Sequence, residues 1–174
     1  GGAARGRFGP GGAAGPGGVA PHPRPGPALH GGRDAPHELA GDGRADIRSG
    51  REVLAALRGD GDGLPSGRAV VWDPLGGPQG VGVAELLARS RPVTLVTPDL
   101  IAGKDLALSG DLAPANTRLQ QAGVEVIKTA HLVQATEGRV VVEDRYTGVR
   151  REIEAGFVVD AAHRVPDVAL WEEA

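Results

Sequence analysis

The stretch RAVVWDPLGGPQGVGVAELLARSRPVTLVT, residues 68–97, decides the fold of this chain. It opens on an apolar run, 68–73, that is typical of a buried strand. A turn rich in Gly and Pro follows at 74–78, and 79–89 then carries apolar residues at helical spacing. A second apolar run, 92–97, predicts another buried strand. Strand, turn, helix and strand in this order form a βαβ unit, whose crossover is expected to be right-handed.

The sequence after this unit predicts one further helix, more strands of the same sheet and an antiparallel meander. A helix is expected at 114–122, with Gly123 at the position after its C-cap. Strands are expected at 124–128, 131–135, 139–143, 150–153 and 157–160, with turns at Glu137-Gly138 and Thr147-Gly148. The predicted fold class is α/β: a Rossmann-like three-layer nucleotide-binding domain with a short parallel sheet of about four strands, flanking helices and a meander across one face.

Composition divides the chain into three parts. Residues 1–45 are rich in Gly, Pro, Ala and Arg, lack periodicity and have almost no large apolar residue, so we expect a disordered arm. Residues 46–67 form a connector with a short helix, in which Ser49 and Glu52 have the spacing of a capping box. Residues 68–174 form the Rossmann-like NAD(P)/FAD-binding-type domain.

Charge and cysteine content exclude several classes of function. The 174-residue chain has no Cys, which excludes a disulfide framework, a thiolate zinc site and an iron–sulfur cluster held by this chain. A net charge of −3 does not indicate nucleic acid or an anionic membrane as partner. No apolar run approaches the roughly 18 to 20 residues of a membrane span. We therefore expect a cytoplasmic protein that binds neither nucleic acid nor membrane.

The turn after the first strand is the first candidate cofactor site. Gly76, Gly77, Gly80 and Gly82 lie where a dinucleotide pyrophosphate would meet the N-terminus of a helix. Glycine suits this position because phosphate oxygens then reach backbone N–H groups without a Cβ in the way. The spacing departs from the GxGxxG fingerprint, and Pro78 removes one donor. A tight turn that binds no phosphate is therefore the alternative.

An acidic residue after the second strand is the next candidate. Asp99 has the position of the carboxylate that binds the ribose hydroxyls in dinucleotide sites, and a solvated loop acid is the alternative. Asp73 closes the first strand and is expected to cap the turn through its own backbone.

Two basic residues follow the last predicted strand. His163 and Arg164 lie at the sheet end where ligands gather in open α/β folds, so they could face a nucleotide or an adjoining domain. A solvated surface loop is the alternative. His131 stands at a strand start and is expected to be structural. We expect no catalytic residue and no metal site, because the sequence has neither a Ser–His–Asp set nor an HExxH spacing.

Several runs of sequence together carry a family resemblance. They are VVWDPLGGPQGVGVAELLA, PVTLVTPDLIAG, GDLAPANTRLQQAGVEVI and the ending VVDAAHRVPD. They resemble the NADH:flavin oxidoreductase family with an old-yellow-enzyme-like barrel and C-terminal FAD/NAD(P)-binding domains. Its mycofactocin-associated, trimethylamine dehydrogenase-like and dienoyl-CoA reductase-like branches are the most similar. The likeness covers Asp46 to Trp171 but not 1–45, and His163 stands where the family usually has Gly or Arg.

The resemblance implies that this chain is a C-terminal fragment of a larger enzyme. In the family, FMN lies in the barrel, Cys residues hold an iron–sulfur cluster, and FAD or ADP occupies a nucleotide domain. The FMN and the cluster are thus expected only in the missing part. This chain corresponds to the second nucleotide-binding-like domain with its connector, and its expected partners are the flavin domain or the barrel domain.

Two functions of different class are consistent with these patterns. In the first, the domain binds NAD(P), FAD or the ADP part of either, and supplies no catalytic residue because the cofactor carries the chemistry. In the second, it is a vestigial packing or interaction domain that binds no nucleotide. A third ligand, S-adenosylmethionine, is disfavoured by the meander, because methyltransferase-like sheets usually continue with further βα units.

Overall fold

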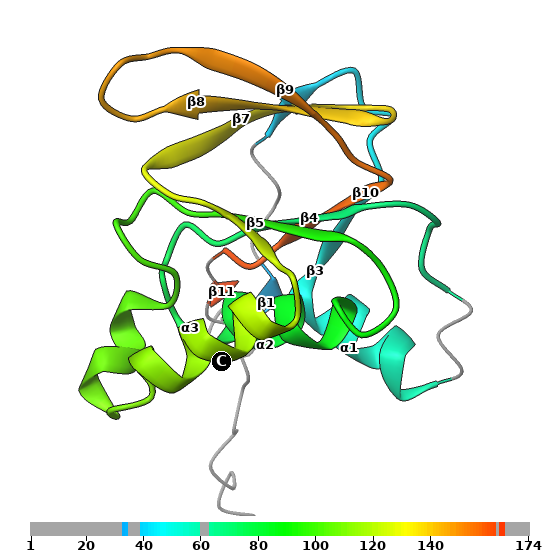
Figure 1. The fold of residues 1–174 in the computed structure, drawn as a ribbon. Helices are drawn as coiled ribbons and strands as arrows, with labels where there is room; N and C mark the ends of the chain where they lie inside the picture. Colours follow the sequence, from blue (N-terminus) through cyan, green and yellow to red (C-terminus); the bar gives the residue numbers. More distant parts are fainter. Residues whose placement is uncertain (1–32, 35–38, 60–62, 163, 166–174) are drawn as a thin grey trace, which may run out of the picture. The chain divides into compact units, whose positions relative to one another are not determined.

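The computed structural model describes residues 33–34, 39–59, 63–162 and 164–165, all within the unit Gly31–Ala174. Its central element is a five-stranded parallel sheet (Figure 1). The strands lie in the order β3 (Ile47–Ser49), β10 (Phe157–Asp160), β4 (Ala69–Trp72), β5 (Val93–Val96) and β6 (Glu125–Ile127). All neighbouring pairs are parallel. Four of these strands were predicted; the connector adds the fifth, the edge strand β3.

An antiparallel meander covers one face of the parallel sheet (Figure 1). It consists of β7 (Ala130–Thr136), β8 (Arg139–Asp144) and β9 (Arg150–Glu154), and β2 (Ala40–Gly41) adds to it parallel to β7. A separate ladder pairs β1 (Arg33–Asp34) with β11 (Arg164–Val165). Most of the arm expected at 1–45 lies outside the described residues. Within that stretch, β1 and β2 are strands where no order was predicted.

The helices lie on the other face of the sheet (Figure 1). They are α1 (Gly50–Arg58), α2 (Pro78–Leu87) and α3 (Leu112–Gln121), with a 3-10 helix, η1 (Lys104–Leu108), before α3. The predicted capping box of α1 is confirmed: the Glu52 N–H donates to the Ser49 hydroxyl, and the Ser49 N–H donates to the Glu52 carboxylate at 2.7 Å. Gly123 follows α3 with φ +71°, as predicted. None of the helices described is long and apolar enough to cross a membrane.

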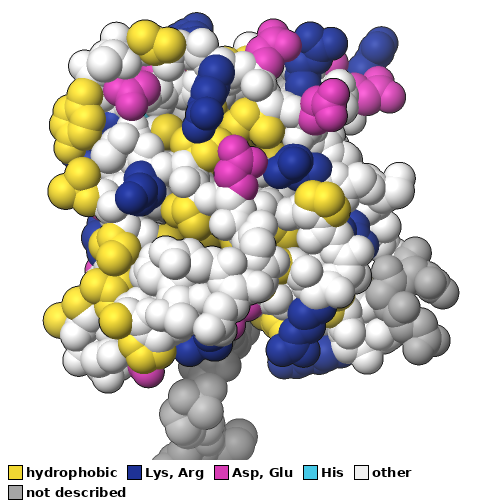
Figure 2. All heavy atoms as spheres, viewed as in Figure 1, with side chains coloured by type: hydrophobic (Ala, Val, Ile, Leu, Met, Phe, Trp, Pro, Cys, Tyr) yellow, Lys and Arg dark blue, Asp and Glu magenta, His cyan; other side chains and the backbone are white. Residues whose placement is uncertain are grey.

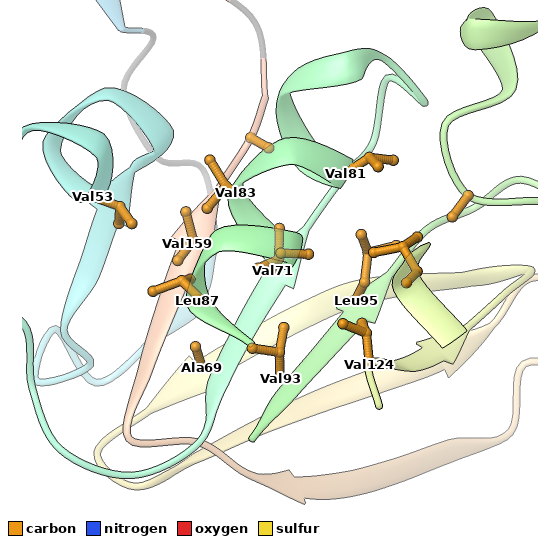
Figure 3. Packing of buried hydrophobic residues seen from close by; sticks show 14 of the residues in the cluster. Val53, Ala69, Val71, Val81, Val83, Leu87, Val93, Leu95, Val124 and Val159 are labelled. Carbon is orange, nitrogen blue, oxygen red and sulfur yellow. The ribbon is translucent and has the colours of Figure 1, made fainter. Parts of the chain in front are cut away.

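Both faces of the parallel sheet are apolar. Successive side chains of a strand point to opposite faces, so Ala69 and Val71 pack with the helices while Val70 and Trp72 pack with the meander. Figure 3 shows the cluster on the helix side, where Leu87 of α2 lies against the sheet. A strand that is apolar on both faces needs a layer on each side, which gives the three layers predicted from the sequence.

Two leucine substitutions, one of a buried side chain and one of an exposed side chain, test this arrangement. Leu95 of β5 is 0% exposed and Leu108 of η1 is 92% exposed. We expect Leu95→Ala to lower the free energy of unfolding by about 2–5 kcal/mol, because it leaves a cavity in the core. The control Leu108→Ala should change it by less than about 0.5 kcal/mol. Urea unfolding followed by circular dichroism measures both changes. Equal losses of stability in the two variants would contradict the placement of Leu95 in the buried core.

Candidate functional site

The turn after β4 lies where the order of the strands reverses. From β4 the chain passes to β5 and then β6 on one side, whereas β10 pairs with β4 on the other. In open α/β sheets ligands bind outside the carboxyl ends of the strands at such a switch point. The segment Gly76–Gly82 follows β4 directly and so stands at this position.

The backbone of the turn is shaped by two glycines and a proline. Gly76 has φ +71°, a conformation that L side chains rarely adopt. A Cβ on Gly76 would also lie 2.7 Å from Oδ2 of Asp99. Gly77 is the N-cap of α2 and Pro78 is its first residue, which has no N–H to donate.

The carboxylate of Asp73 lies inside the turn. Asp73 is 1% exposed, and its Oδ1 accepts the N–H of Gly76 at 3.0 Å. The predicted capping role of Asp73 is therefore confirmed. Burial raises the pKa of Asp73 to about 6, although the backbone amides of Gly76, Leu75 and Gly77 lower it and the charge of Asp99 raises it further. The backbone amides of this turn thus already stabilise an anion that belongs to the chain itself.

The other Asp73 oxygen rests against helix α2. Among the described residues, Oδ2 of Asp73 has no hydrogen-bond partner. A Cβ on Gly80 would lie 2.6 Å from Cγ and 2.9 Å from Oδ2 of Asp73, so Gly80 leaves the space that the carboxylate fills. Gly82, by contrast, has no atom within 4 Å of its Cβ position. Of these two helix glycines, only Gly80 is required by packing.

Asp99, the predicted ribose ligand, is paired with a lysine. The Nζ of Lys104 lies 3.0 Å from Oδ1 and 2.9 Å from Oδ2 of Asp99. The hydrogen bond to Asp99 is the main reason why the pKa of Lys104 is raised. The same loop is tied to the turn, because the N–H of Asp105 donates to the carbonyl of Gly76 at 2.9 Å. Lys104 was not singled out from the sequence; its only signal was a cation five residues after Asp99 in a loop.

The side chains of the two basic residues predicted after β10 lie outside the described part of the chain. His163 lies outside the described residues, and Arg164 is placed only as backbone of β11, opposite Asp34 of β1. His131, predicted to be structural, is the second residue of β7, and its ring centroid lies 6.0 Å from that of Trp72. The described geometry thus brings Asp73 and Asp99 to the glycine turn.

Thr129 joins three loops beside the site. It has φ +54°, the only positive φ of a described residue other than glycine, and its N–H donates to the carbonyl of Asp99. Its own carbonyl accepts the N–H of Arg145, whose side chain donates to the carbonyl of Pro98 at 3.1 Å. A β-branched residue in this conformation is strained. These bonds fix the loops after β5, β6 and β8 to one another.

Large apolar side chains are exposed on these loops. Figure 2 shows hydrophobic side chains along the side of the molecule where the β5–α3 loop and the β8–β9 turn lie. The exposed large apolar residues of the described chain are Leu100, Ile101, Leu108, Tyr146 and Val149, which we call the apolar loop surface. Exposed apolar side chains that gather on one side of a protein are typical of protein–protein contacts.

A cavity of about 590 Å³ lies at the opposite end of the sheet. Arg68, at the amino end of β4, lines it together with Arg139 and Glu152 of the meander. None of the predicted site residues is among those that line this cavity. Among the described residues there is no cluster of His, Asp or Glu that could hold a metal ion.

Solved structures share this fold. Histamine dehydrogenase from Rhizobium sp. 4-9 superposes with a TM-score of 0.71, at 21% identity over 78% of this chain. 6-Hydroxypseudooxynicotine amine oxidase from Pseudomonas geniculata N1 gives 0.70, at 20% identity over 82%, and 2-naphthoyl-CoA reductase gives 0.67, at 16% identity over 82%. The chain spans only 21%, 21% and 20% of these proteins. No protein-family model and no curated protein sequence matches it.

A smaller enzyme gives a further comparison. Thioredoxin reductase from T. acidophilum has a TM-score of 0.61 at 16% identity, over 82% of this chain and 45% of that one. The fold resembles that of Rossmann-type FAD/NAD-binding domains. The resemblance to flavin oxidoreductases that the sequence suggested is confirmed for the fold of this Rossmann-type domain.

The raised pKa of Asp73 predicts a dependence of stability on pH. The ionised carboxylate is disfavoured in the folded chain, so its contribution to the free energy of unfolding falls as pH rises from about 4 to about 6 and stays low above. A shift from 3.8 to about 6 corresponds to about 3 kcal/mol. Asp73→Asn has no carboxyl group to ionise. As pH rises from 4 to 7.5, we therefore expect its free energy of unfolding to increase, relative to that of wild type, by about this amount.

Urea titrations of both proteins at several pH values measure this difference. Asp105→Asn, which removes an exposed carboxylate from the neighbouring loop, controls for the loss of one negative charge. A difference between Asp73→Asn and wild type that is constant from pH 4 to pH 7.5 would rule out the buried carboxylate as its cause.

The two glycines of α2 should respond oppositely to the same substitution. Gly80→Ala forces the new Cβ into the Asp73 carboxyl group, and we expect a loss of about 1–3 kcal/mol in unfolding free energy. Gly82→Ala has open space and a helical backbone, so we expect a gain of about 0.5–1 kcal/mol. Thermal and urea unfolding measure both; a loss at Gly82 or a gain at Gly80 would contradict the packing described.

Proposed function

We propose that this chain is the C-terminal Rossmann-type domain of a multidomain flavin-dependent oxidoreductase, and that it docks other domains rather than holding a dinucleotide. Its fold is shared with about a fifth of each of three much longer proteins, two of them named as a dehydrogenase and a reductase. Redox chemistry would then belong to FMN, FAD or an iron–sulfur cluster in the rest of the enzyme. This chain has no Cys to hold such a cluster.

One observation carries the choice of docking over binding: the buried carboxylate of Asp73 occupies the glycine turn. The N–H of Gly76 donates to this carboxylate, and the amides of Leu75 and Gly77 also favour its charged form. A pyrophosphate at this turn would meet a negative charge in a site of low dielectric, where repulsion between charges is strong. The residues present at the turn therefore do not fit a pyrophosphate group.

The ribose position supports the same proposal. In dinucleotide sites a carboxylate at this place accepts hydrogen bonds from the ribose hydroxyls. Here both carboxylate oxygens of Asp99 lie within 3.0 Å of the Lys104 ammonium group, and the side chain of Asp99 is only 15% exposed. A ribose at this carboxylate would have to compete with the lysine.

The apolar loop surface supports the docking role. Its loops are held to one another by backbone hydrogen bonds at Thr129 and by the bond from Arg145 to Pro98. A surface that is fixed in shape yet apolar loses little conformational freedom when a partner covers it. The flavin domain or the barrel domain of the same enzyme is the proposed partner.

Dinucleotide binding is the second candidate function. It is favoured by the position of the turn at the switch point of the sheet. Gln79 and Gly80 stand in the first turn of α2, where N–H groups have no acceptor within the helix. In this function Gly76, Gly77, Gly80 and Gly82 would contact the pyrophosphate of NAD(P), FAD or ADP, Asp99 would hold the ribose, and His163 and Arg164 would face the cofactor.

Calorimetric titration of the whole chain with NADH, NADPH, FAD and ADP at pH 7.5 separates the two functions. We expect no binding tighter than about 1 mM, which corresponds to roughly −4 kcal/mol. Amide spectra recorded with ¹⁵N-labelled protein should show no shift at Leu75, Gly76 and Gly77 on addition of ADP. Tighter binding of any of these ligands, with shifts at the turn, would establish the second function instead.

A further inference from the structure

We propose that Asp73 is the specificity-determining residue of this turn: its carboxylate takes the place of a phosphate, and its removal converts the turn into a binding site for a diphosphate group. This inference rests on the proposed function, in which the wild-type turn holds no nucleotide. It assigns that property to one side chain rather than to the Pro78 ring or to the irregular spacing of the glycines.

The first support is the direction of the backbone amides. The N–H of Gly76 points at Oδ1 of Asp73 with an N···O distance of 3.0 Å, and the amides of Leu75 and Gly77 also favour the charged form of Asp73. A backbone turn whose amides favour one anion is also suited to a phosphate oxygen. In this chain the anion is covalently attached directly after β4, so a phosphate has to compete with a carboxylate that is always present at high effective concentration.

The second support is an incomplete set of hydrogen bonds. Oδ2 of Asp73 is buried and has no partner in the part of the chain that the structure describes. A buried carboxylate oxygen without a donor costs free energy. Asp73 is therefore not an optimised structural cap: the turn holds a carboxylate in a space that satisfies only one of its oxygens.

The third support is the room around the turn. Gly80 leaves the space that the Asp73 carboxyl group occupies, since a Cβ on Gly80 would lie 2.6 Å from Cγ of Asp73. On the other side, the Cβ position of Gly77 has no atom within 4 Å. A shorter side chain at position 73 would free the space beside Gly80, close to the N-terminus of α2, where an anion is stabilised.

The experiment compares wild type, Asp73→Ser and Asp73→Asn by calorimetric titration with inorganic pyrophosphate and with ADP at pH 7.5. Asp73→Ser removes both the charge and the bulk, and we expect it to bind both probes at least tenfold more tightly than wild type. Asp73→Asn removes the charge but keeps the shape, so it should bind more tightly than wild type and more weakly than Asp73→Ser. Amide shifts should fall on Leu75, Gly76 and Gly77.

Asp105→Ser is the matched control, because it removes one exposed carboxylate beside the turn whose side chain accepts none of these amides. Equal tightening in Asp105→Ser and Asp73→Ser would overturn the inference by showing an effect of net charge alone. Circular dichroism and thermal unfolding verify that each variant is folded. Should Asp73→Ser fail to fold, Asp73→Asn decides the question, since it preserves the volume of the side chain.

The outcomes also separate this inference from the function on which it rests. If wild type binds ADP away from the turn, the proposed function is wrong. The inference about Asp73 is then decided by whether the Asp73 variants bind at the turn. Wild type that binds at Leu75–Gly77 would overturn both. If neither wild type nor the folded Asp73 variants bind pyrophosphate or ADP, the proposed function stands, but the inference that Asp73 excludes a diphosphate group is wrong.

Discussion

Burial of β4 on both of its faces is the constraint on which the rest of the domain depends. Its four residues are almost wholly removed from solvent. Ala69 and Val71 are covered by helices and Val70 and Trp72 by the meander, so neither layer can be dispensed with. The strand also delivers Asp73 to the carboxyl edge. The packing of the sheet and the character of the turn thus originate in the same run of sequence.

The turn shows that bare amides do not by themselves specify a ligand. Glycines permit close approach of any anion, whether it comes from a cofactor or from the chain. Here Gly76 supplies the left-handed backbone and Gly80 the space, and both are used by a carboxylate that stands one residue after β4. In the function proposed here, the residue that follows the strand matters as much as the glycines for whether such a turn accepts a phosphate.

Most of the architecture followed from patterns local in sequence. The unit from β4 to β5, the capping box at Ser49 and the meander could be predicted because each depends on neighbouring residues. The edge strand β3 was missed, since three residues of a connector carry no period and acquire a partner only through β10. The pairing of Asp99 with Lys104 was missed for a similar reason: it depends on how a loop folds back over the turn.

The position of β10 sets the order in which the domain can be assembled. This strand lies inside the parallel sheet, between β3 and β4, yet it is formed by Phe157–Asp160, after the whole meander. Until those residues are available, the inner edge of β4 has no hydrogen-bonding neighbour and β3 has nothing to join. Contacts between segments so distant in sequence slow folding. During synthesis on the ribosome, the central sheet would therefore stay open until β10 has emerged, a period in which its unpaired edges favour aggregation.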